Sequence, residues 1–300
     1  MIAAVVAAVL TAVIVLAVLT LTNLFEPQVS GLDLPPIDRH KLDLAALAAG
    51  EKVTFIGSTM PLDRQFRMLL EPNQIGPSQY GDDICSFHAF QYSMLEVCGD
   101  PGIDRYKVRL KLRRQYDKGG PQDAAEEGVS NIGFYFGHTE VRAAAGHPVH
   151  AMFSVQFRDF DREAKLNGKP PQKKPVSLLR TILQQKPGVN LPAKTDRVAT
   201  LRFEPSLTVP GRWRVIEAEL TPERVRVWWQ DDADTLVVLA DWTVEQIRHQ
   251  VELMRRDADA VAPGAGGAIP DWTPRTGFGV FNHKSSVGVK DVVVTPIPLP

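Results

Sequence analysis

The sequence has few cysteines, no excess of basic residues and none of the common nucleotide-binding or nucleophile motifs. Two cysteines among 300 residues exclude a disulfide-rich scaffold and a zinc site with four thiolate ligands. Thirty-four Lys and Arg against 35 Asp and Glu give a net charge of -1, which argues against a nucleic-acid partner. The chain lacks a Gly-x-x-x-x-Gly-Lys loop, a Gly-x-Ser-x-Gly elbow, the kinase signature set and a Cys-x-x-Cys pair. Several common enzyme classes are therefore excluded.

Charge is also missing from residues 1–24, whose only polar side chains are Thr11, Thr20, Thr22 and Asn23. About 20 apolar residues in a helix span the hydrocarbon core of a bilayer. No Lys or Arg precedes the run and no small-x-small site follows it. This pattern favours an uncleaved transmembrane anchor over a cleaved signal peptide or a buried core helix.

The flank of this segment indicates its orientation. The first charges after it are Glu26, Asp33 and Asp38, and only then Arg39 and Lys41. Because basic residues mark the cytoplasmic side, the body is expected outside the cytoplasm. Residues 25–49 read as a proline-containing stem with a short helix over 40–49, and residues 50–300 form the body.

The body is rich in short segments with period-two alternation. In 105–114, Tyr106, Val108, Leu110 and Leu112 alternate with basic residues, which is typical of a half-buried antiparallel strand. Strands separated by Gly and Pro turns indicate a mainly β protein, an antiparallel sandwich or barrel. The expected strands are 52–59, 66–70, 86–95, 105–114, 131–136, 149–157, 197–203, 212–220, 224–230, 235–240, 277–282 and 287–295.

Two helices are expected within the strands. Residues 177–185 carry Leu178, Leu179, Ile182 and Leu183 at helical spacing. Residues 243–261 begin with the capping-box pattern of Thr243 and Gln246. The apolar stripe of this second helix, Val244, Ile247, Val251 and Met254, is interpreted as core packing, and docking of a partner protein is the alternative.

Glu217 and Glu219 lie on one face of a strand and suggest a glycosidase pair. The turn at Thr221 and Pro222 predicts a hairpin in which residue i faces residue 443 minus i, which pairs Glu219 with Arg224 and Glu217 with Arg226. An adjacent arginine lowers the pKa of a carboxylate, which is wrong for a general acid. We therefore expect a solvated, ion-paired face and assign no catalytic residue.

Two parts of the chain carry a resemblance. The stretches 211–215 and 221–227, GRWRV and TPERVRV, and the ending GFGVF (277–281) followed by SSVGVKDVVVTP (285–296), resemble concanavalin A-like lectin/glucanase modules, including laminin-G-like and keto-disaccharide-hydrolase-like ones. The resemblance covers about 200–296 clearly and 52–160 loosely. It implies a jelly-roll sandwich and frequent glycan binding. The Glu-x-Asp-x-x-Glu strand of the glucanase members is absent, because Glu217-Ala218-Glu219 lacks the Asp.

Other polar clusters are candidates for metal or disulfide sites. His138, His147 and His150 cluster in sequence, and the last two suggest a metal-binding pair. Pro148 disfavours the helix that such a pair would need, and a fixed third ligand is missing, so the three are interpreted as loop and strand-start residues. Two acidic runs, 82–83 and 231–234, could coordinate Ca²⁺, but the second reads better as a solvated turn, so no metal or cofactor is expected. In an oxidising compartment Cys85 and Cys98 could form a disulfide, and two buried thiols is the alternative.

Tryptophans are the remaining ligand candidates, because an exposed indole can stack on a sugar ring. Trp228 is expected on the outer face of its strand with Trp229 in the core, and Trp242 and Trp272 are expected at loop edges. The sequence thus predicts a non-catalytic, membrane-anchored, extracytoplasmic β-sandwich that binds a carbohydrate or other surface ligand. A glycoside-acting hydrolase of the same fold and a scaffolding ectodomain are the alternatives.

Overall fold

The computed structural model describes residues 39–57, 66–70, 79–81, 84–115, 131–142, 147–186, 189–208, 211–231 and 233–299. The compact body begins at Arg39. The expected anchor, 1–24, lies outside the described residues. Of the helices in the described ranges, none has the length and apolar character needed to cross a bilayer.

The described body is mainly β. Its helices are α2 (Arg39–Ala48), α3 (Arg162–Asn167) and α4 (Val244–Val261), with a 3-10 turn η2 (Gly266–Ala268). The strands are β1 (Val53–Ile56), β2 (Arg67–Leu70), β3 (Gln79–Gly81), β4 (Ile84–Cys98), β5 (Tyr106–Gln115), β6 (Asn131–Arg142), β7 (Pro148–Phe157), β8 (Lys174–Lys186), β9 (Val189–Phe203), β10 (Arg214–Leu220), β11 (Arg224–Gln230), β12 (Leu236–Thr243) and β13 (Gly277–Pro296).

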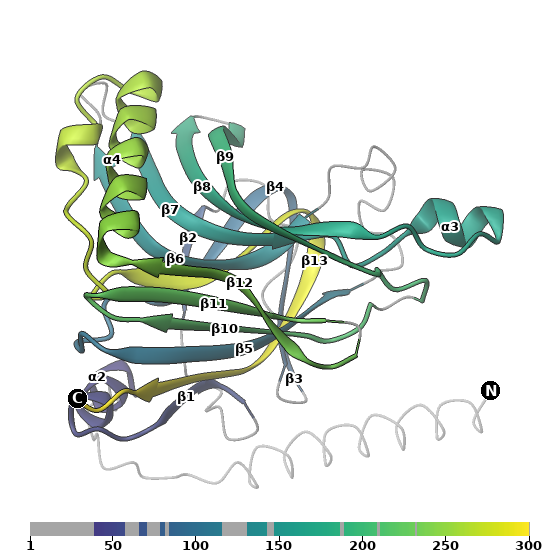
Figure 1. The fold of residues 1–300 in the computed structure, drawn as a ribbon, viewed down its shortest axis with the longest axis horizontal. Coiled ribbons are helices and arrows are strands. Elements are labelled where there is room, and N and C mark those ends of the chain that lie inside the picture. The colour runs from purple at the N-terminus through teal and green to yellow at the C-terminus, as the bar shows by residue number, and fades with distance from the viewer. Residues whose placement is uncertain are drawn as a thin grey trace, which may run out of the picture. The chain divides into compact units, whose positions relative to one another are not determined.

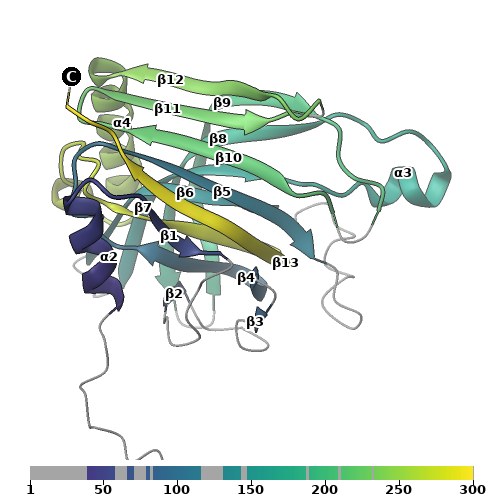
Figure 2. The same cartoon turned by 90° about the horizontal axis from the view of Figure 1, so that it is seen from below.

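One long strand, β13, joins the two layers of the fold (Figures 1 and 2). Its first part, 277–283, pairs with β6 and β4, and its last part, 290–296, pairs with β5 and β1. The order β12-β11-β10-β5-β13-β6-β7-β8-β9 is therefore one antiparallel sheet that folds at β13 into a sandwich. We call β12, β11, β10, β5 and the last part of β13 the first layer, and the remaining large strands the second layer.

Aromatic rings fill the space between the layers. Trp229 of β11 contacts Phe157 of β7 at a centroid distance of 4.5 Å and Phe203 of β9 at 5.1 Å. The predicted alternation of β5 is confirmed, because Tyr106, Val108, Leu110 and Leu112 are buried and the intervening basic residues face outward. The period-two pattern thus explains which side chains build this core.

Helix α4 closes one open edge of the sandwich, where it contacts β8, β11 and β12. Its predicted capping box is present, since the Thr243 N–H donates to Gln246 Oε1 at 2.9 Å. The apolar stripe packs inward through Ile247, Val251 and Met254. The interpretation of this stripe as core packing is therefore confirmed.

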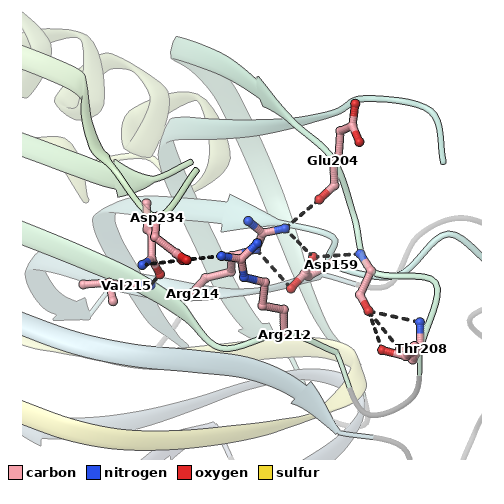
Figure 3. A network of polar contacts seen from close by, with 9 residues as sticks. Asp159, Glu204, Thr208, Arg212, Arg214, Val215 and Asp234 are labelled. Atoms are coloured by element: carbon pink, nitrogen blue, oxygen red, sulfur yellow. Dashed lines mark hydrogen bonds and ion pairs between the residues drawn. The ribbon is translucent and has the colours of Figure 1, made fainter. Parts of the chain in front are cut away.

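A buried ion pair ties the opposite end together (Figure 3). Arg214, at the start of β10, donates to Asp159, which follows β7, at 3.3 Å through Nε and 3.2 Å through Nη2. The same guanidinium donates to the Glu204 carbonyl at 2.6 Å, and Asp159 accepts from the Ser206 N–H at 3.2 Å. Both charged side chains are almost fully buried, so their mutual hydrogen bonds offset the cost of desolvation.

Two sequence-based expectations are wrong. Residues 177–185 form part of β8, not a helix. Leu178 and Ile182 face the main core, whereas Leu183 belongs to a separate apolar cluster on the other face. A strand buried on both faces loses its alternation, and this gave the false helical spacing.

The β10–β11 hairpin has a register different from the predicted one. Ile216 faces Trp229, so residue i pairs with 445 minus i, and Glu219 faces Arg226. A four-residue turn explains the shift, because the Thr221 N–H donates to the Arg224 carbonyl at 3.0 Å. A shift of two residues keeps every side chain on its predicted face.

Candidate functional site

The tryptophans expected to bind sugar do not converge. Trp242 faces the core, 8% exposed, with its ring 5.4 Å from Phe153, so its placement at a loop edge is wrong. Trp272 is half-buried, and its Nε1–H donates to the Thr221 carbonyl at 3.0 Å. Trp228 lies half-buried on the outer face of the first layer, with Lys107 Nζ 5.1 Å from its ring centroid. These rings form no common platform.

The two glutamates of β10 sit among cations, as expected, although with other partners. Glu217 bonds to Lys107 and lies 3.4 Å from Arg109 Nε, both on β5. Arg224 and Arg226 instead bind Asp241 of β12. The predicted ion-paired face is therefore present, but its pairs form with the neighbouring strands. β5 supplies the cations that bind Glu217, and β12 supplies the carboxylate that binds the two arginines.

A disulfide between Cys85 and Cys98 is excluded by their positions. Both are buried thiols that form no disulfide, and they lie at the two ends of the single strand β4. A strand rises about 3.3 Å per residue, so their Cα atoms are tens of ångströms apart, far beyond disulfide range. Burial raises the pKa of the Cys98 thiol to about 12.

The acidic run after β11 forms a turn. The Asp231 carboxylate accepts from the Ala233 N–H at 2.9 Å and the Thr235 N–H at 2.8 Å, and Asp234 pairs with Arg212 (Figure 3). Across the described parts of the chain, His, Cys, Asp and Glu side chains do not gather into a group of three that could hold a metal. Residues 82–83, the other acidic run, lie outside the described residues.

The structure gathers polar side chains at a different place, on the face of the second layer that points away from the main core. The layer curves so strongly that β9 returns to contact β4. The enclosed side, which we call the concave face, carries a second apolar cluster made of Leu69, Leu70, Tyr92, Met94, Tyr135, Met152, Leu183 and Phe281.

Glycines shape this concave face. The Tyr92 and Phe281 rings stack at 5.1 Å with an interplanar angle of 6°. A Cβ at Gly133 would lie 2.5 Å from the Phe281 ring, and one at Gly279 would lie 2.6 Å from the Tyr135 hydroxyl. The two glycines therefore leave room for the Phe281 and Tyr135 rings on the neighbouring strands.

Two histidines and a glutamate form a chain across this face. His138 Nε2 lies 3.1 Å from His150 Nδ1, and His138 Nδ1 lies 3.6 Å from Glu96 Oε2. At the outer end, Arg67 donates to Glu140 at 3.0 Å and lies 3.8 Å from Glu96. The chain runs from Arg67, whose side chain is 63% exposed, to His150, which is 1% exposed.

The inner end of the chain is neutral and partly unpaired. Burial, reinforced by His138 and Arg67, lowers the pKa of His150 to about 3. The His150 Nε2 atom and the Tyr135 hydroxyl are buried and make no hydrogen bond within the described structure, and the buried Tyr92 hydroxyl has the Gln156 side chain beside it. Burial also raises the pKa of both tyrosines, the Tyr92 pKa despite the opposing effect of Gln156. The site thus offers one neutral acceptor and two hydroxyl groups.

The histidine pair was missed because of a bulge. Between Phe136 and Thr139 the β6–β7 register shifts at Gly137, which has a φ of +66°. The extra residue places His138 on the face that holds Tyr135 and His150, whereas plain alternation would turn it toward the core. A glycine inside a strand pattern is the one sequence signal that could have indicated this.

Comparison with known proteins gives likeness only in three dimensions. No family model and no curated protein matches the sequence. The carbohydrate-binding module CBM66 from Bacillus subtilis is 8% identical, with 81% of this chain and 94% of that chain covered and a TM-score of 0.33. The Ca²⁺-bound exoplasmic/lumenal domain of VIP36 is 9% identical, with 82% and 88% covered and a TM-score of 0.37.

A putative glycosyl hydrolase from Parabacteroides distasonis is 13% identical, with 73% of this chain and 83% of that chain covered and a TM-score of 0.36. At these identities and scores the likeness is one of general architecture. These similarities therefore do not assign a function to the side chains described above.

Proposed function

We propose that the chain is a non-catalytic, membrane-anchored, extracytoplasmic module that binds a carbohydrate at its concave face. One observation carries this proposal: among the described residues, the His150 Nε2 atom and the Tyr135 hydroxyl are buried on that face without hydrogen-bond partners. A buried polar group that lacks a partner costs about 1–3 kcal/mol, so such groups normally serve a ligand or an ordered water.

A sugar matches this set of groups chemically. A sugar hydroxyl can donate to the neutral His150 Nε2 and accept from a tyrosine hydroxyl. The Tyr92 and Phe281 rings stack on each other and are buried, so they form apolar support beside these polar groups. The polar rim of Arg67, Glu96 and Glu140 supplies further hydrogen bonds at the exposed end.

The anchoring part of the proposal rests on sequence. Residues 1–24 are uncharged and long enough to span a bilayer, and the acidic residues after them favour a body outside the cytoplasm. A carbohydrate ligand fits this placement, because glycans lie at the cell surface.

A glycoside hydrolase is the second candidate, because Glu96 and Glu140 both approach Arg67. Hydrolysis needs one protonated and one ionised carboxyl group across the scissile bond. Both carboxylates here contact the same Arg67 guanidinium, so binding without turnover is the better reading. Scaffolding through α4 lacks support, since its apolar stripe is buried in the sandwich.

The proposal is tested with the full chain in uncharged detergent against an immobilised panel of neutral polysaccharides. We expect retention on at least one polysaccharide, loss of retention in Tyr135→Phe, and no release of reducing sugar. Tyr106→Phe is the matched control, since its hydroxyl donates to the Pro274 carbonyl at 2.9 Å within the main core. Absence of any retention, or equal retention by both variants and the parent, contradicts the proposal, and turnover that depends on Glu96 supports the hydrolase.

A further inference from the structure

A tryptophan on the outer face of the first layer carries two cations on its ring. The Arg113 guanidinium carbon lies 4.5 Å, and Lys290 Nζ 4.4 Å, from the centroid of Trp213. Trp213 precedes β10, Arg113 lies on β5 and Lys290 lies on β13, so three adjacent strands of one face meet at this ring. All three side chains are half-buried.

These two cations differ from the other basic residues of the face. The remaining ones each have a carboxylate partner: Lys107 and Arg109 bind Glu217, Lys111 binds Asp291, and Arg224 and Arg226 bind Asp241. Within the described residues, neither Arg113 nor Lys290 has an acidic partner. The Trp213 position is thus a local excess of positive charge on a chain whose net charge is -1.

The local geometry makes this excess costly for the protein alone. Lys290 lies directly opposite Lys111 in the β13–β5 register, and like charges at facing positions are destabilising. Arg113 Nε is buried without a hydrogen-bond partner, and burial lowers the pKa of this guanidinium. Gly288 faces Arg113 across the same strand pair, and the Gln115 side chain lies over this glycine. Two cations held on one indole, with no counter-charge from the described residues, form a preorganised anion receptor.

We infer that the Trp213 position is a second binding site, which takes the carboxylate or sulfate group of an acidic polysaccharide. Guanidinium and ammonium groups make charge-assisted hydrogen bonds to such anions, and the guanidinium fork can do so in bidentate fashion. An anionic membrane surface is a poorer match, because adsorption to acidic lipids uses clusters of about four to eight unpaired basic residues. This site lies on the opposite layer from the concave face and does not depend on it.

The test measures binding of oligogalacturonate to the full chain in uncharged detergent, with its methyl ester as the uncharged counterpart. Dextran sulfate and dextran form a second charged and uncharged pair. We expect binding to a charged member, no measurable binding to its uncharged counterpart, and an affinity that falls as salt is raised. Arg113→Gln and Lys290→Gln should each weaken this binding about tenfold, the equivalent of one charge-assisted hydrogen bond.

Arg226→Gln is the matched control, because it removes a charge from the same face while Arg224 still neutralises Asp241. Its affinity should stay within about twofold of the parent. Equal binding to charged and uncharged sugars, no binding to either charged sugar, or unchanged affinity in both Trp213-site variants overturns the inference. Binding of soluble dihexanoylphosphatidylglycerol that both variants abolish, in place of sugar binding, assigns the site to lipid and also overturns it. Tyr135→Phe should leave oligogalacturonate binding intact, so this result is independent of the concave face.

Discussion

At the scale of single residues, the concave face carries buried polar groups that lack hydrogen-bond partners within the described residues, and such groups lower the stability of the fold. Within the described part of the chain, the Tyr135 hydroxyl and the His150 Nε2 atom are buried on the concave face without hydrogen-bond partners, whereas the hydroxyl of Tyr106, in the main core, donates to a carbonyl. Buried tyrosine hydroxyls thus behave differently in the main core and on the concave face, which is the difference expected if the concave face binds a ligand.

The two tyrosines give a direct comparison of stability. Tyr135→Phe removes a hydroxyl that has no partner, so the free energy of unfolding should stay the same or rise by up to about 1 kcal/mol. Tyr106→Phe removes a bonded hydroxyl and leaves the Pro274 carbonyl unpaired, so it should lower the free energy of unfolding by about 1–2 kcal/mol. Urea unfolding of both variants measures the difference, and a larger loss in Tyr135→Phe would show that this hydroxyl is structurally paired.

His150 predicts a dependence of stability on pH. Burial lowers its pKa in the folded chain to about 3, whereas an unfolded histidine titrates near pH 6.5. The unfolded chain therefore takes up a proton that the folded chain does not, and this contribution to stability is complete above about pH 6.5. It should fall by up to about 1.4 kcal/mol per pH unit as pH drops below 6.5.

The measurement is urea unfolding of the parent and His150→Gln at pH 7.5, 6 and 5. The loss of stability between pH 7.5 and 5 should be clearly smaller in His150→Gln. His249→Gln, on the exposed face of α4, is the control and should lose as much as the parent. Identical pH profiles for the parent and His150→Gln would mean that His150 has the same pKa in the folded and unfolded chains, which would contradict its burial as a neutral group.

At the scale of elements, α4 is fixed to β8 by a polar network as well as by its apolar stripe. Arg180, 7% exposed, donates through Nε to Asp257 at 2.7 Å, through Nη1 to Gln250 at 2.8 Å and through Nη2 to Asp196 at 2.6 Å. Lys194 also reaches Asp257 at 2.5 Å, and both cations lower the pKa of the Asp257 carboxyl. The edge of the sandwich therefore depends on one buried arginine.

Arg180→Met should destabilise the fold by about 3 kcal/mol, because it leaves the largely buried Asp257 with Lys194 as its remaining cation. The double variant Arg180→Met with Asp257→Leu should recover most of that loss, since it removes both charges together. Chemical unfolding of the single and double variants measures this. A loss below about 0.5 kcal/mol in the single variant would contradict a central role for Arg180.

The strands that could be predicted are those with one solvated face. The alternation in β5 and the two-faced β10–β11 hairpin follow from the sequence, and the structure confirms which side chains of each face the core. β8 could not be recognised, because Leu178 and Leu183 are buried on opposite faces and erase the period. The length of the turn at 221–224 could not be read from the sequence either, so the predicted register of the β10–β11 hairpin differs from the observed one by two residues.

The candidate site was less accessible to prediction than the fold. The chain Glu96–His138–His150 joins β4, β6 and β7, and the bulge at Gly137 decides the direction of His138. No short motif encodes such long-range pairing. The sequence instead pointed to tryptophans by residue type, and Trp242 belongs to the core.

At the scale of the whole molecule, an apolar N-terminal segment precedes a sandwich with two separate proposed ligand faces. The concave face is apolar and neutral at its inner end, and the Trp213 position is cationic. The two faces differ in chemistry, so a single ligand type is not expected to compete for both.

The proposed anchor, residues 1–24, predicts how the intact chain partitions. After expression, the full chain should stay with membranes through an alkaline carbonate wash, and replacing Val13 and Leu16 by Lys should release it, because two charges at the centre of a spanning helix cost several kcal/mol. Protease added outside intact cells should digest the body. Release of the parent chain by the wash, or protection from external protease, would contradict the anchored, extracytoplasmic arrangement.

The most direct test of the central claim is nitrogen NMR of the full chain labelled with ¹⁵N-histidine, titrated with neutral trisaccharides of glucose, mannose and N-acetylglucosamine. In the free protein, His150 Nε2 should resonate as an unprotonated nitrogen without a hydrogen bond. A trisaccharide that binds should shift this one signal toward a hydrogen-bonded acceptor and leave exposed His249 unchanged. Binding of a trisaccharide with no change at His150 Nε2 would contradict the account.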